Sequence, residues 1–209
     1  MRAADVITGF YAVLDRDDEA LARVLVGAGG ARVLQIRLKP RGSAAGADAR
    51  DVVRVARMAR QVCDEVGAAL VINDRVDIAL AVGADGVHLG QTDLPLADAR
   101  RIAGDRLWIG VSTHDVAQVR AACAGGADYL GFGPIFATAT KASPDAVQGL
   151  DRLRAAVEAA GQVPIVAIGG ITSSAASSVY ETGAAAICAI GAVLDEADVG
   201  AAARALARR

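Results

Sequence analysis

The feature that most constrains the fold is the alternation of short apolar runs with amphipathic segments along the chain. Eight runs rich in Val, Ile and Leu are predicted strands, at residues 10–14, 33–39, 69–73, 86–90, 107–112, 129–133, 164–169 and 186–191. The segments between them have helical spacing, as in residues 48–67, where Val52, Val55 and Val62 recur on one face. Strands that alternate with helices are parallel and are joined by right-handed crossovers. The pattern therefore predicts an α/β protein.

The number of strand–helix pairs selects the architecture within this class. Eight pairs match a (β/α)8 barrel, and 209 residues lie near the lower limit of about 200 for that fold. No Pro/Ser-rich linker divides the chain, and the only irregular stretches are residues 40–48 and 137–149. An open doubly wound sheet is the main alternative, but no G-x-G-x-x-G follows the first strand. We predict a single-domain (β/α)8 TIM barrel over residues 1–209.

Composition excludes several classes of partner and compartment. The net charge is −2 with mixed charges, and aromatic residues make up only 3%, which disfavours nucleic-acid binding. The longest apolar uncharged stretch, residues 183–194, has 12 residues and is too short to span a bilayer. An early Asp5 argues against a secretory signal. Cys63, Cys123 and Cys188 are isolated and are expected to be small buried hydrophobes in a reducing cytoplasm.

The second predicted strand, VLQIRLK at residues 33–39, has one polar face. Because side chains alternate along a strand, Gln35, Arg37 and Lys39 share that face. The opposite face carries Leu34, Ile36 and Leu38. A closed barrel has no edge strand, so the polar face points inward. Two buried cations without partners are very costly, which predicts a bound polyphosphate. The alternative is an ion pair with Asp74, which could satisfy Arg37 but not both cations.

Two carboxylates follow adjacent strands. Asp74 comes after the third strand and Asp93 after the fourth, at the carboxyl rim where barrel enzymes carry their sites. Two carboxylates are what Mg²⁺ typically takes from a protein when substrate phosphates and water supply the remaining oxygens. The structural alternatives are that Asp74 pairs with Arg75 or Arg37, and that Asp93 caps the segment LPLADARR. The nearby Arg37 and Lys39 favour the interpretation that the two aspartates bind a metal ion.

Glycines and hydroxyls follow the later strands. Gly169 and Gly170 form a tight turn, with Thr172 or Ser173 as the expected cap of the next helix. Exposed amides there, and after the eighth strand, favour a phosphate site over a plain turn.

The sixth strand runs into TATK, residues 138–141. This segment offers two hydroxyls and a cation, in a loop long enough to act as a lid; the alternative is a solvated loop. His88 is at least as well explained as a hydrogen-bonded core residue, and His114 as a helix-start residue near the site.

Several segments together resemble the thiamine-phosphate synthase family from the second strand to the eighth: LQIRLK, INDRVDIALAVGADGVHLGQTDLP, IGVSTH, GADYLGFGPIFATATK, AVQGL and PIVAIGGI. The resemblance implies a small (β/α)8 barrel, a transferase of thiamine biosynthesis. It joins 4-amino-5-hydroxymethyl-2-methylpyrimidine diphosphate to a thiazole phosphate, with Mg²⁺, and releases pyrophosphate by a dissociative path.

The resemblance also implies roles for individual residues. The pyrimidine diphosphate would be held by Gln35, Arg37, Lys39 and Asn73. Mg²⁺ would be held by Asp74 and Asp93, and pyrophosphate would be contacted by Ser112 and Lys141. The thiazole phosphate would be held by Thr138, Thr140, Gly170, Ile190 and Gly191. Arg37, Lys39, Lys141 and Ser112 would be the catalytic set.

Two positions depart from the family pattern, and three rival functions stay open. Leu38 stands where the family usually has Glu, and Gly191 where it commonly has Ser, which predicts weaker thiazole-phosphate binding. The rivals are a thiazole tautomerase-like isomerase that would use His114, a non-catalytic phosphate-ligand binder, and a sugar-phosphate epimerase. The sequence does not determine the oligomeric state, and a homodimer is one option.

Overall fold

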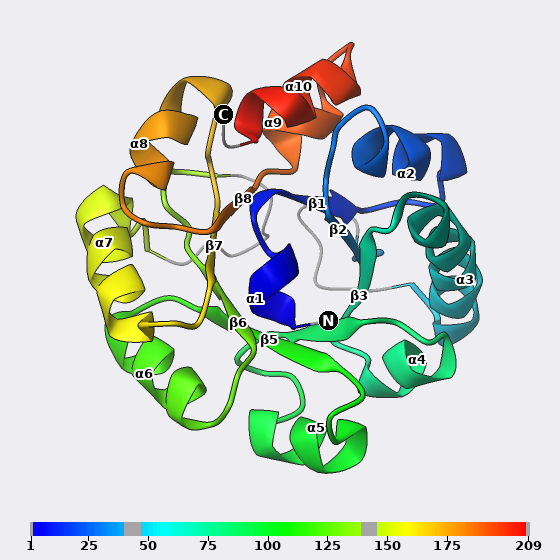
Figure 1. The fold of residues 1–209 in the computed structure, drawn as a ribbon, viewed down its shortest axis with the longest axis horizontal. Helices are drawn as coiled ribbons and strands as arrows, with labels where there is room; N and C mark the ends of the chain where they lie inside the picture. Colours follow the sequence, from blue (N-terminus) through cyan, green and yellow to red (C-terminus); the bar gives the residue numbers. More distant parts are fainter. Residues whose placement is uncertain (1, 40–46, 139–145, 208–209) are drawn as a thin grey trace.

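The computed structural model describes residues 2–39, 47–138 and 146–207, and in it eight parallel strands close into one barrel (Figure 1). The strands are β1 (Gly9–Leu14), β2 (Val33–Ile36), β3 (Ala69–Asn73), β4 (Gly86–Leu89), β5 (Trp108–Thr113), β6 (Tyr129–Phe132), β7 (Ile165–Ile168) and β8 (Ala186–Cys188). Each strand pairs with its neighbour in sequence, and β1 closes the barrel against β8. The predicted (β/α)8 TIM barrel is confirmed.

Helices surround the barrel, except for the short amino-terminal helix, which lies over its centre (Figure 1). They are α1 (Ala3–Val6), α2 (Glu19–Val26), α3 (Ala49–Val66), α4 (Val76–Ala81), α5 (Leu96–Ala103), α6 (Val116–Ala124), α7 (Gly149–Ala160), the 3-10 turn η1 (Ser173–Ala175), α8 (Ala176–Tyr180), α9 (Gly191–Leu194) and α10 (Val199–Leu206). Four of them begin after an aspartate whose side chain accepts a backbone N–H, a strong N-cap: Asp18, Asp48, Asp115 and Asp198. No helix in the described part of the chain is long and apolar enough to cross a membrane.

Strand alternation divides the apolar residues into two cores. Leu34 and Ile36 of β2 belong to the larger core between the barrel and its helices, and Leu38 packs against the same core, as predicted. Val33 belongs to a smaller core inside the barrel, and the buried Gln35 lies on the same inward side, against Tyr11. The inward polar face of this strand is therefore a property of the barrel.

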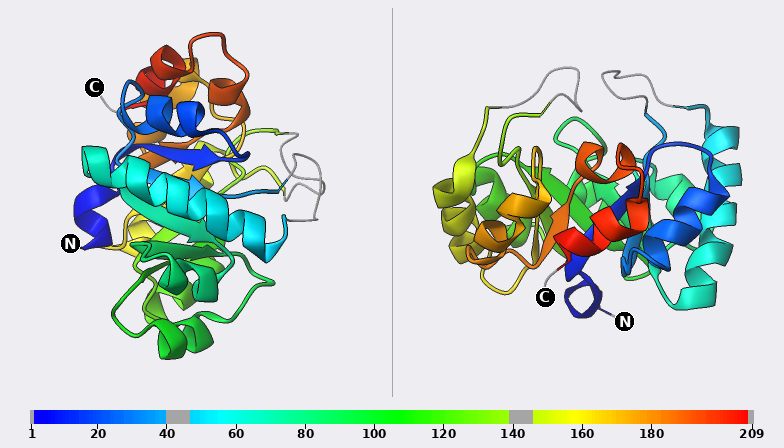
Figure 2. Two further views of the ribbon diagram at one scale, coloured as in Figure 1. Left: turned by 90° about the vertical axis from the view of Figure 1, so that its right-hand side faces the viewer. Right: turned by 90° about the horizontal axis from the view of Figure 1, so that it is seen from above.

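The amino-terminal helix plugs one end of the barrel. Ala3, Val6 and Ile7 are buried against the inner core, and α1 lies beneath the strands in the right-hand view of Figure 2. The sequence predicts no element here, because four helical residues are too few to show periodicity. The plug closes this end of the barrel, which leaves the opposite end for a ligand.

Two predicted strands end three residues earlier than expected. β2 stops at Ile36. After it, the Arg37 amide still donates to the Leu14 carbonyl of β1, but the Lys39 amide donates to the Arg37 carbonyl of its own loop and so leaves the sheet. β8 stops at Cys188, because the chain turns into α9 with Ile190 at its N-cap position. Arg37 and Lys39 therefore lie in the loop that follows β2.

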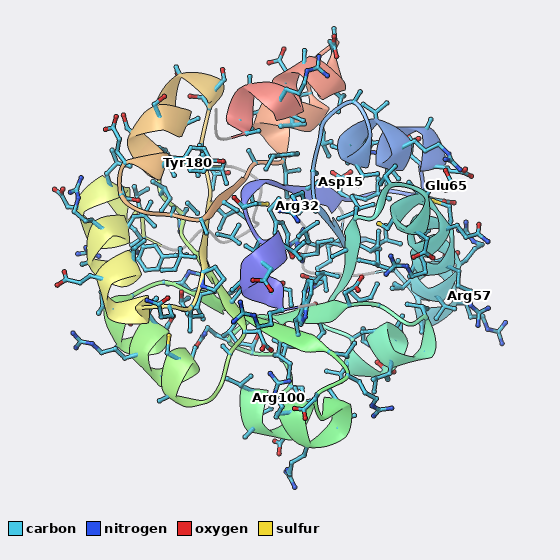
Figure 3. The ribbon with its side chains drawn as sticks, viewed as in Figure 1. Asp15, Arg32, Arg57, Glu65, Arg100 and Tyr180 are labelled. Carbon is cyan, nitrogen blue, oxygen red and sulfur yellow. The ribbon has the colours of Figure 1, made fainter. Side chains whose placement is uncertain are left out.

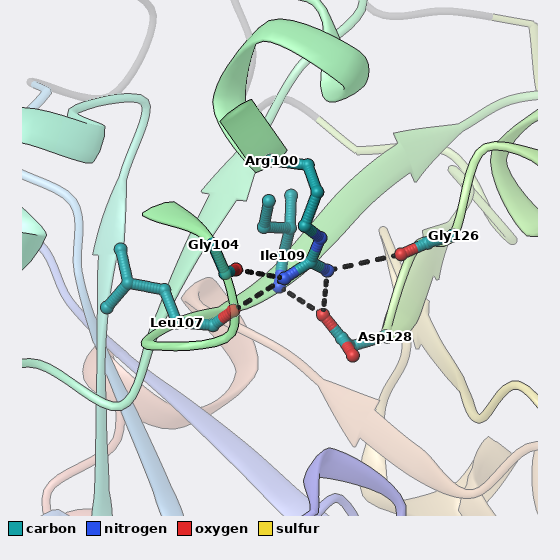
Figure 4. Close-up of polar contacts among 6 residues, drawn as sticks. All are labelled: Arg100, Gly104, Leu107, Ile109, Gly126 and Asp128. Carbon is teal, nitrogen blue, oxygen red and sulfur yellow. Dashed lines mark hydrogen bonds and ion pairs between the residues drawn. The ribbon is translucent and has the colours of Figure 1, made fainter. Parts of the chain in front are cut away.

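Paired arginine–aspartate clamps fasten helices to strands at the amino ends. Asp128, just before β6, accepts the Ile109 amide at 2.7 Å and a guanidinium nitrogen of Arg100 at 2.5 Å (Figure 4). Arg100 also donates to three backbone carbonyls, those of Gly104, Leu107 and Gly126. Asp85, just before β4, likewise accepts the Leu70 amide of β3 and a guanidinium nitrogen of Arg60. These clamps hold α3 and α5 in register with the strands.

Candidate active site

A cavity of about 450 Å³ opens at the carboxyl ends of the strands. Its polar wall comes from strands β2 to β5 and the loop after β2: Gln35, Arg37, Asn73, His88 and Ser112. The opposite wall is formed by glycine-rich segments after β7 and β8, which include Gly169, Gly170 and Gly191. The cavity thus has Arg37 and side-chain amides on one side and glycine-rich backbone on the other.

Beside the cavity, two carboxylates and one cation form a compact group. Lys39 makes an ion pair with Asp74. The Asp93 carboxylate accepts the Gly90 amide at 2.7 Å, and burial together with that nearby carboxylate raises the pKa of Asp74 above its ordinary value. Asp74 adopts a left-handed φ of 63°, a conformation that non-glycine residues seldom adopt. The two carboxylates outnumber the one cation, and carboxylate oxygens are the donors that a divalent cation such as Mg²⁺ prefers.

Three structural alternatives for these aspartates are wrong. Asp74 pairs with Lys39 and not with Arg37, and Arg75 pairs with Asp77. Asp93 does not cap a helix, because α5 starts at Leu96 behind Pro95. The described residues contain no group of three or more metal-ligating side chains, so this site would depend on oxygens from a ligand or from water.

A line of hydrogen bonds crosses the barrel interior from β5 to β3. Ser112 Oγ lies 2.9 Å from His88 Nε2, and His88 Nδ1 lies 3.1 Å from the Tyr129 hydroxyl. The Tyr129 and Tyr11 hydroxyl oxygens are 3.0 Å apart. The Tyr11 hydroxyl donates to Gln35 Oε1 at 2.9 Å. Neither tyrosine was predicted from the sequence, although the alternation of each with outward residues on β1 and β6 was the signal that could have indicated them.

The line ends at an amide pair on the cavity wall. Gln35 Nε2 donates to Asn73 Oδ1 at 2.8 Å. Burial raises the pKa of Tyr11 and Tyr129 well above the ordinary tyrosine value, so both hydroxyls stay neutral. His88 is a hydrogen-bonded core residue, as expected, and it also lines the cavity.

The glycine turn after β7 needs glycine on steric grounds. A Cβ on Gly170, at a φ of 65°, would lie 2.4 Å from the Ala137 carbonyl oxygen. Thr172 stands at the N-cap position of η1 but makes no capping bond, because its hydroxyl pairs with Ser174. Ser173 lies inside η1, so the predicted side-chain cap is wrong.

The segment after β8 is also tight. A Cβ on Gly191 would lie 3.2 Å from a carboxylate oxygen of Asp195. His114 also lines the cavity, and its Nδ1 lies 2.6 Å from the Gly133 carbonyl oxygen. His114 directly precedes Asp115, which is the N-cap of α6.

Most of the predicted site residues come together. The cavity is lined by Gln35, Arg37, Asn73, Ser112, Thr138, Gly170, Ile190 and Gly191. Lys39, Asp74 and Asp93 form the adjoining charged group. Thr140 and Lys141 lie outside the described residues. The set comes from strand ends that are far apart in sequence, and barrel closure brings it together.

Comparison with known proteins identifies the family. The thiamine monophosphate synthase family model matches residues 6–193. The thiamine-phosphate synthase of Chloroflexus aurantiacus is 48% identical over 178 residues, which cover 85% of this chain and 79% of that protein. That of Moorella thermoacetica is 45% identical over 179 residues, covering 86% and 82%.

Solved structures agree with the sequence relatives. Thiamine phosphate pyrophosphorylase from Pyrococcus furiosus superposes with a TM-score of 0.85 at 35% identity, covering 97% of this chain and 95% of that one. A 3-hexulose-6-phosphate synthase, at 20% identity and a TM-score of 0.69, covers 95% of this chain and 97% of its own and shares the fold alone. The chain therefore belongs to the thiamine monophosphate synthase family, and it is a transferase of thiamine biosynthesis.

Proposed function

We propose that this chain couples 4-amino-5-hydroxymethyl-2-methylpyrimidine diphosphate to a thiazole phosphate, giving thiamine phosphate and pyrophosphate in a Mg²⁺-dependent, dissociative reaction. The observation that carries the proposal is the charged group of Lys39, Asp74 and Asp93 beside a cavity that Arg37 also lines. Carboxylates and cations in one place suit a ligand that brings both a metal and phosphates.

In the proposed reaction, the bond between the pyrimidine methylene carbon and the diphosphate oxygen breaks, and both electrons leave with pyrophosphate. The thiazole nitrogen then donates its lone pair to the pyrimidine cation and forms the new C–N bond. Negative charge develops on the leaving group, and Arg37, Lys39, Ser112 and Lys141 would stabilise it. The step needs no protein nucleophile.

Two side-chain amides and two glycine-rich segments would orient the substrates. Gln35 and Asn73 each present amide hydrogen-bonding groups to the cavity and would hold the aminopyrimidine edge. Backbone amides near Gly170 and Gly191, together with Thr138 and Thr140, would hold the thiazole phosphate. Asp74 and Asp93 would hold Mg²⁺, which supplies positive charge to the diphosphate when bound.

Release of pyrophosphate from the two phosphorylated precursors tests the proposal, with MgCl₂ or with chelator. Metal-dependent release is expected. A folded sample that releases no pyrophosphate with both precursors and Mg²⁺ would contradict the assignment and favour an isomerase or a binder.

Arg37→Ala should lower kcat by about 10²- to 10³-fold, the usual cost of losing a preorganised charge or donor at a developing anion. Lys141→Ala should also act mainly on turnover. Arg32→Ala is the matched control, because Arg32 is exposed at the other end of the same strand (Figure 3). Equal kcat in Arg37→Ala, Lys141→Ala and Arg32→Ala would refute the leaving-group role.

A further inference from the structure

The hydrogen bonds inside the barrel form one unbroken line that joins the two ends of the proposed pyrimidine diphosphate site. One end is the amide pair of Gln35 and Asn73, and the other is the Ser112 hydroxyl. Two buried tyrosines, with 3% and 0% of their surface exposed, lie between these ends and touch no bulk water. We call this line the hydroxyl relay: Asn73, Gln35, Tyr11, Tyr129, His88 and Ser112.

The Gln35 amide determines the direction of every bond in the hydroxyl relay. Gln35 Oε1 faces Tyr11, so the single Tyr11 proton points to Gln35. The Tyr11 oxygen must then accept from the Tyr129 hydroxyl, and the Tyr129 oxygen must accept from an Nδ1–H of His88. A neutral His88 with its proton on Nδ1 has a bare Nε2, which accepts the Ser112 proton.

This direction has a chemical consequence at the Ser112 end. With its proton directed to His88, Ser112 presents only oxygen lone pairs to the cavity, and lone pairs repel an anion. If Ser112 turns its proton to a diphosphate, His88 Nε2 loses its donor, and this loss is made good with a neutral ring when every bond of the hydroxyl relay reverses. The reversal needs a half-turn of the Gln35 amide, which exchanges donor and acceptor toward Asn73 at the other end.

We propose that Tyr11, Tyr129 and His88 are positioning residues that couple the two ends of the site. In the free chain Ser112 donates to His88. When diphosphate binds, the hydroxyl relay reverses: water in the cavity that His88 lines gives a proton to Nε2 and takes up the proton that leaves Nδ1, so the ring stays neutral. Ser112 then donates to the anion, and the amide pair changes its hydrogen-bonding pattern toward the pyrimidine. The inference rests on the proposed function, because it assigns diphosphate to the Ser112 end. It makes recognition of the pyrimidine ring and stabilisation of the leaving group one linked event.

The tautomer of His88 reports the direction without any turnover. The chain has only two histidines, so ¹⁵N–¹H correlation spectra of the imidazoles contain two ring systems, which a His114→Gln variant assigns. We expect His88 to carry its proton on Nδ1 in the free chain and on Nε2 after inorganic pyrophosphate and MgCl₂ are added. His114, whose Nδ1 faces the Gly133 carbonyl, should stay Nδ1-protonated in both states.

Three results would overturn the inference: an Nε2 proton on His88 in the free chain, an unchanged tautomer with pyrophosphate bound by calorimetry, or a doubly protonated ring. Absence of pyrophosphate binding would contradict the proposed function and the reversal with it. The tautomer of the free chain tests the direction separately, so the two failures are distinguishable.

Variants test the coupling in catalysis. Tyr129→Phe keeps the ring but interrupts the hydroxyl relay, and Tyr11→Phe interrupts it at a second point if the first variant folds poorly. Each should lower kcat about tenfold with the KM for thiazole phosphate unchanged, and should abolish the pyrophosphate-induced change at His88. Because Tyr129 acts through Ser112, Tyr129→Phe should cost nothing further in a Ser112→Ala background.

Tyr180→Phe is the matched control. The Tyr180 hydroxyl (Tyr180 is labelled in Figure 3) lies 2.9 Å from the Gly9 carbonyl oxygen and 2.8 Å from that of Leu206, and Tyr180 is not among the residues that line the cavity. Its loss should lower the Tm and leave kcat and the His88 tautomers as in the wild type. The contrary result is a double variant Tyr129→Phe, Ser112→Ala that loses kcat by the product of the two single effects, with a lower Tm like that of Tyr180→Phe. That result would show that Tyr11 and Tyr129 are structural residues only.

Discussion

At the scale of single residues, Asp74 combines burial, a neighbouring carboxylate and a left-handed backbone. Its pKa is raised above the ordinary 3.8, so the folded state holds more protons than the unfolded state just above that pH, and stability falls as the pH rises through this interval. Asp74→Asn removes the charge and suits the positive φ. In chelator, we expect a higher Tm than wild type at pH 7, with the difference shrinking toward pH 3.

The activity of Asp74→Asn and its response to Mg²⁺ should be lower than those of the wild type, although its Tm in chelator is higher. Mg²⁺ should raise the Tm of the wild type but not that of Asp74→Asn, because ligand binding to the native state stabilises it. Pyrophosphate release should fall sharply. A variant that melts below the wild type at pH 7 in chelator would show that the Lys39 ion pair outweighs the crowding of Asp74 and Asp93.

Gly191 is the second informative residue. A serine hydroxyl at this position is expected to add a phosphate contact, so Gly191→Ser should lower the KM for thiazole phosphate about two- to tenfold, the value of one hydrogen bond, with kcat unchanged. The added side chain lies close to the Asp195 carboxylate, which competes for its proton. Adding Asp195→Ala should therefore lower the KM further. An unchanged KM in both variants would contradict the role of this position.

At the scale of secondary-structure elements, the clamps at the amino ends tie helices to strands. Asp128→Ala leaves the Ile109 amide and the Arg100 guanidinium without their shared acceptor, which should cost about 1–3 kcal/mol. Urea denaturation should show a lower midpoint, with KM values unchanged because the clamp is at the end opposite the cavity. Asp151→Ala is the control, since that carboxylate is 99% exposed, and it should shift stability by less than about 0.5 kcal/mol.

At the scale of the whole molecule, one end of the barrel provides stability and the other holds the site. Ile7 is 1% exposed in the plug beneath the inner core, so Ile7→Ala should cost about 2–5 kcal/mol and leave both KM values unchanged. Circular dichroism and Trp108 fluorescence should both report the loss of stability as a lower Tm, because Ile7 packs in the core inside the closed barrel. Val66→Ala, at a 52% exposed position, is the control.

The sequence predicted the parts of this protein that depend on local patterns. Alternation of apolar runs and helical spacing predicted the barrel, and side-chain alternation predicted the inward face of the second strand, because periodicity follows directly from backbone geometry. Residue types at the strand ends predicted the cavity wall, including Gln35, Arg37 and Asn73. The short α1 was missed, and β2 and β8 were predicted too long, because a strand ends where its partners end, and that is not a local property.

Only the tertiary structure decided which of these residues meet. Lys39 lies beside Asp74, although the two are 35 positions apart, because β2 and β3 are neighbours in the barrel. Tyr11 and Tyr129, 118 positions apart, share a hydrogen bond because closure of the barrel brings β1 and β6 across one interior. The chemistry of each side chain is written in the sequence, but a hydrogen bond between distant strands exists only after the chain has closed on itself.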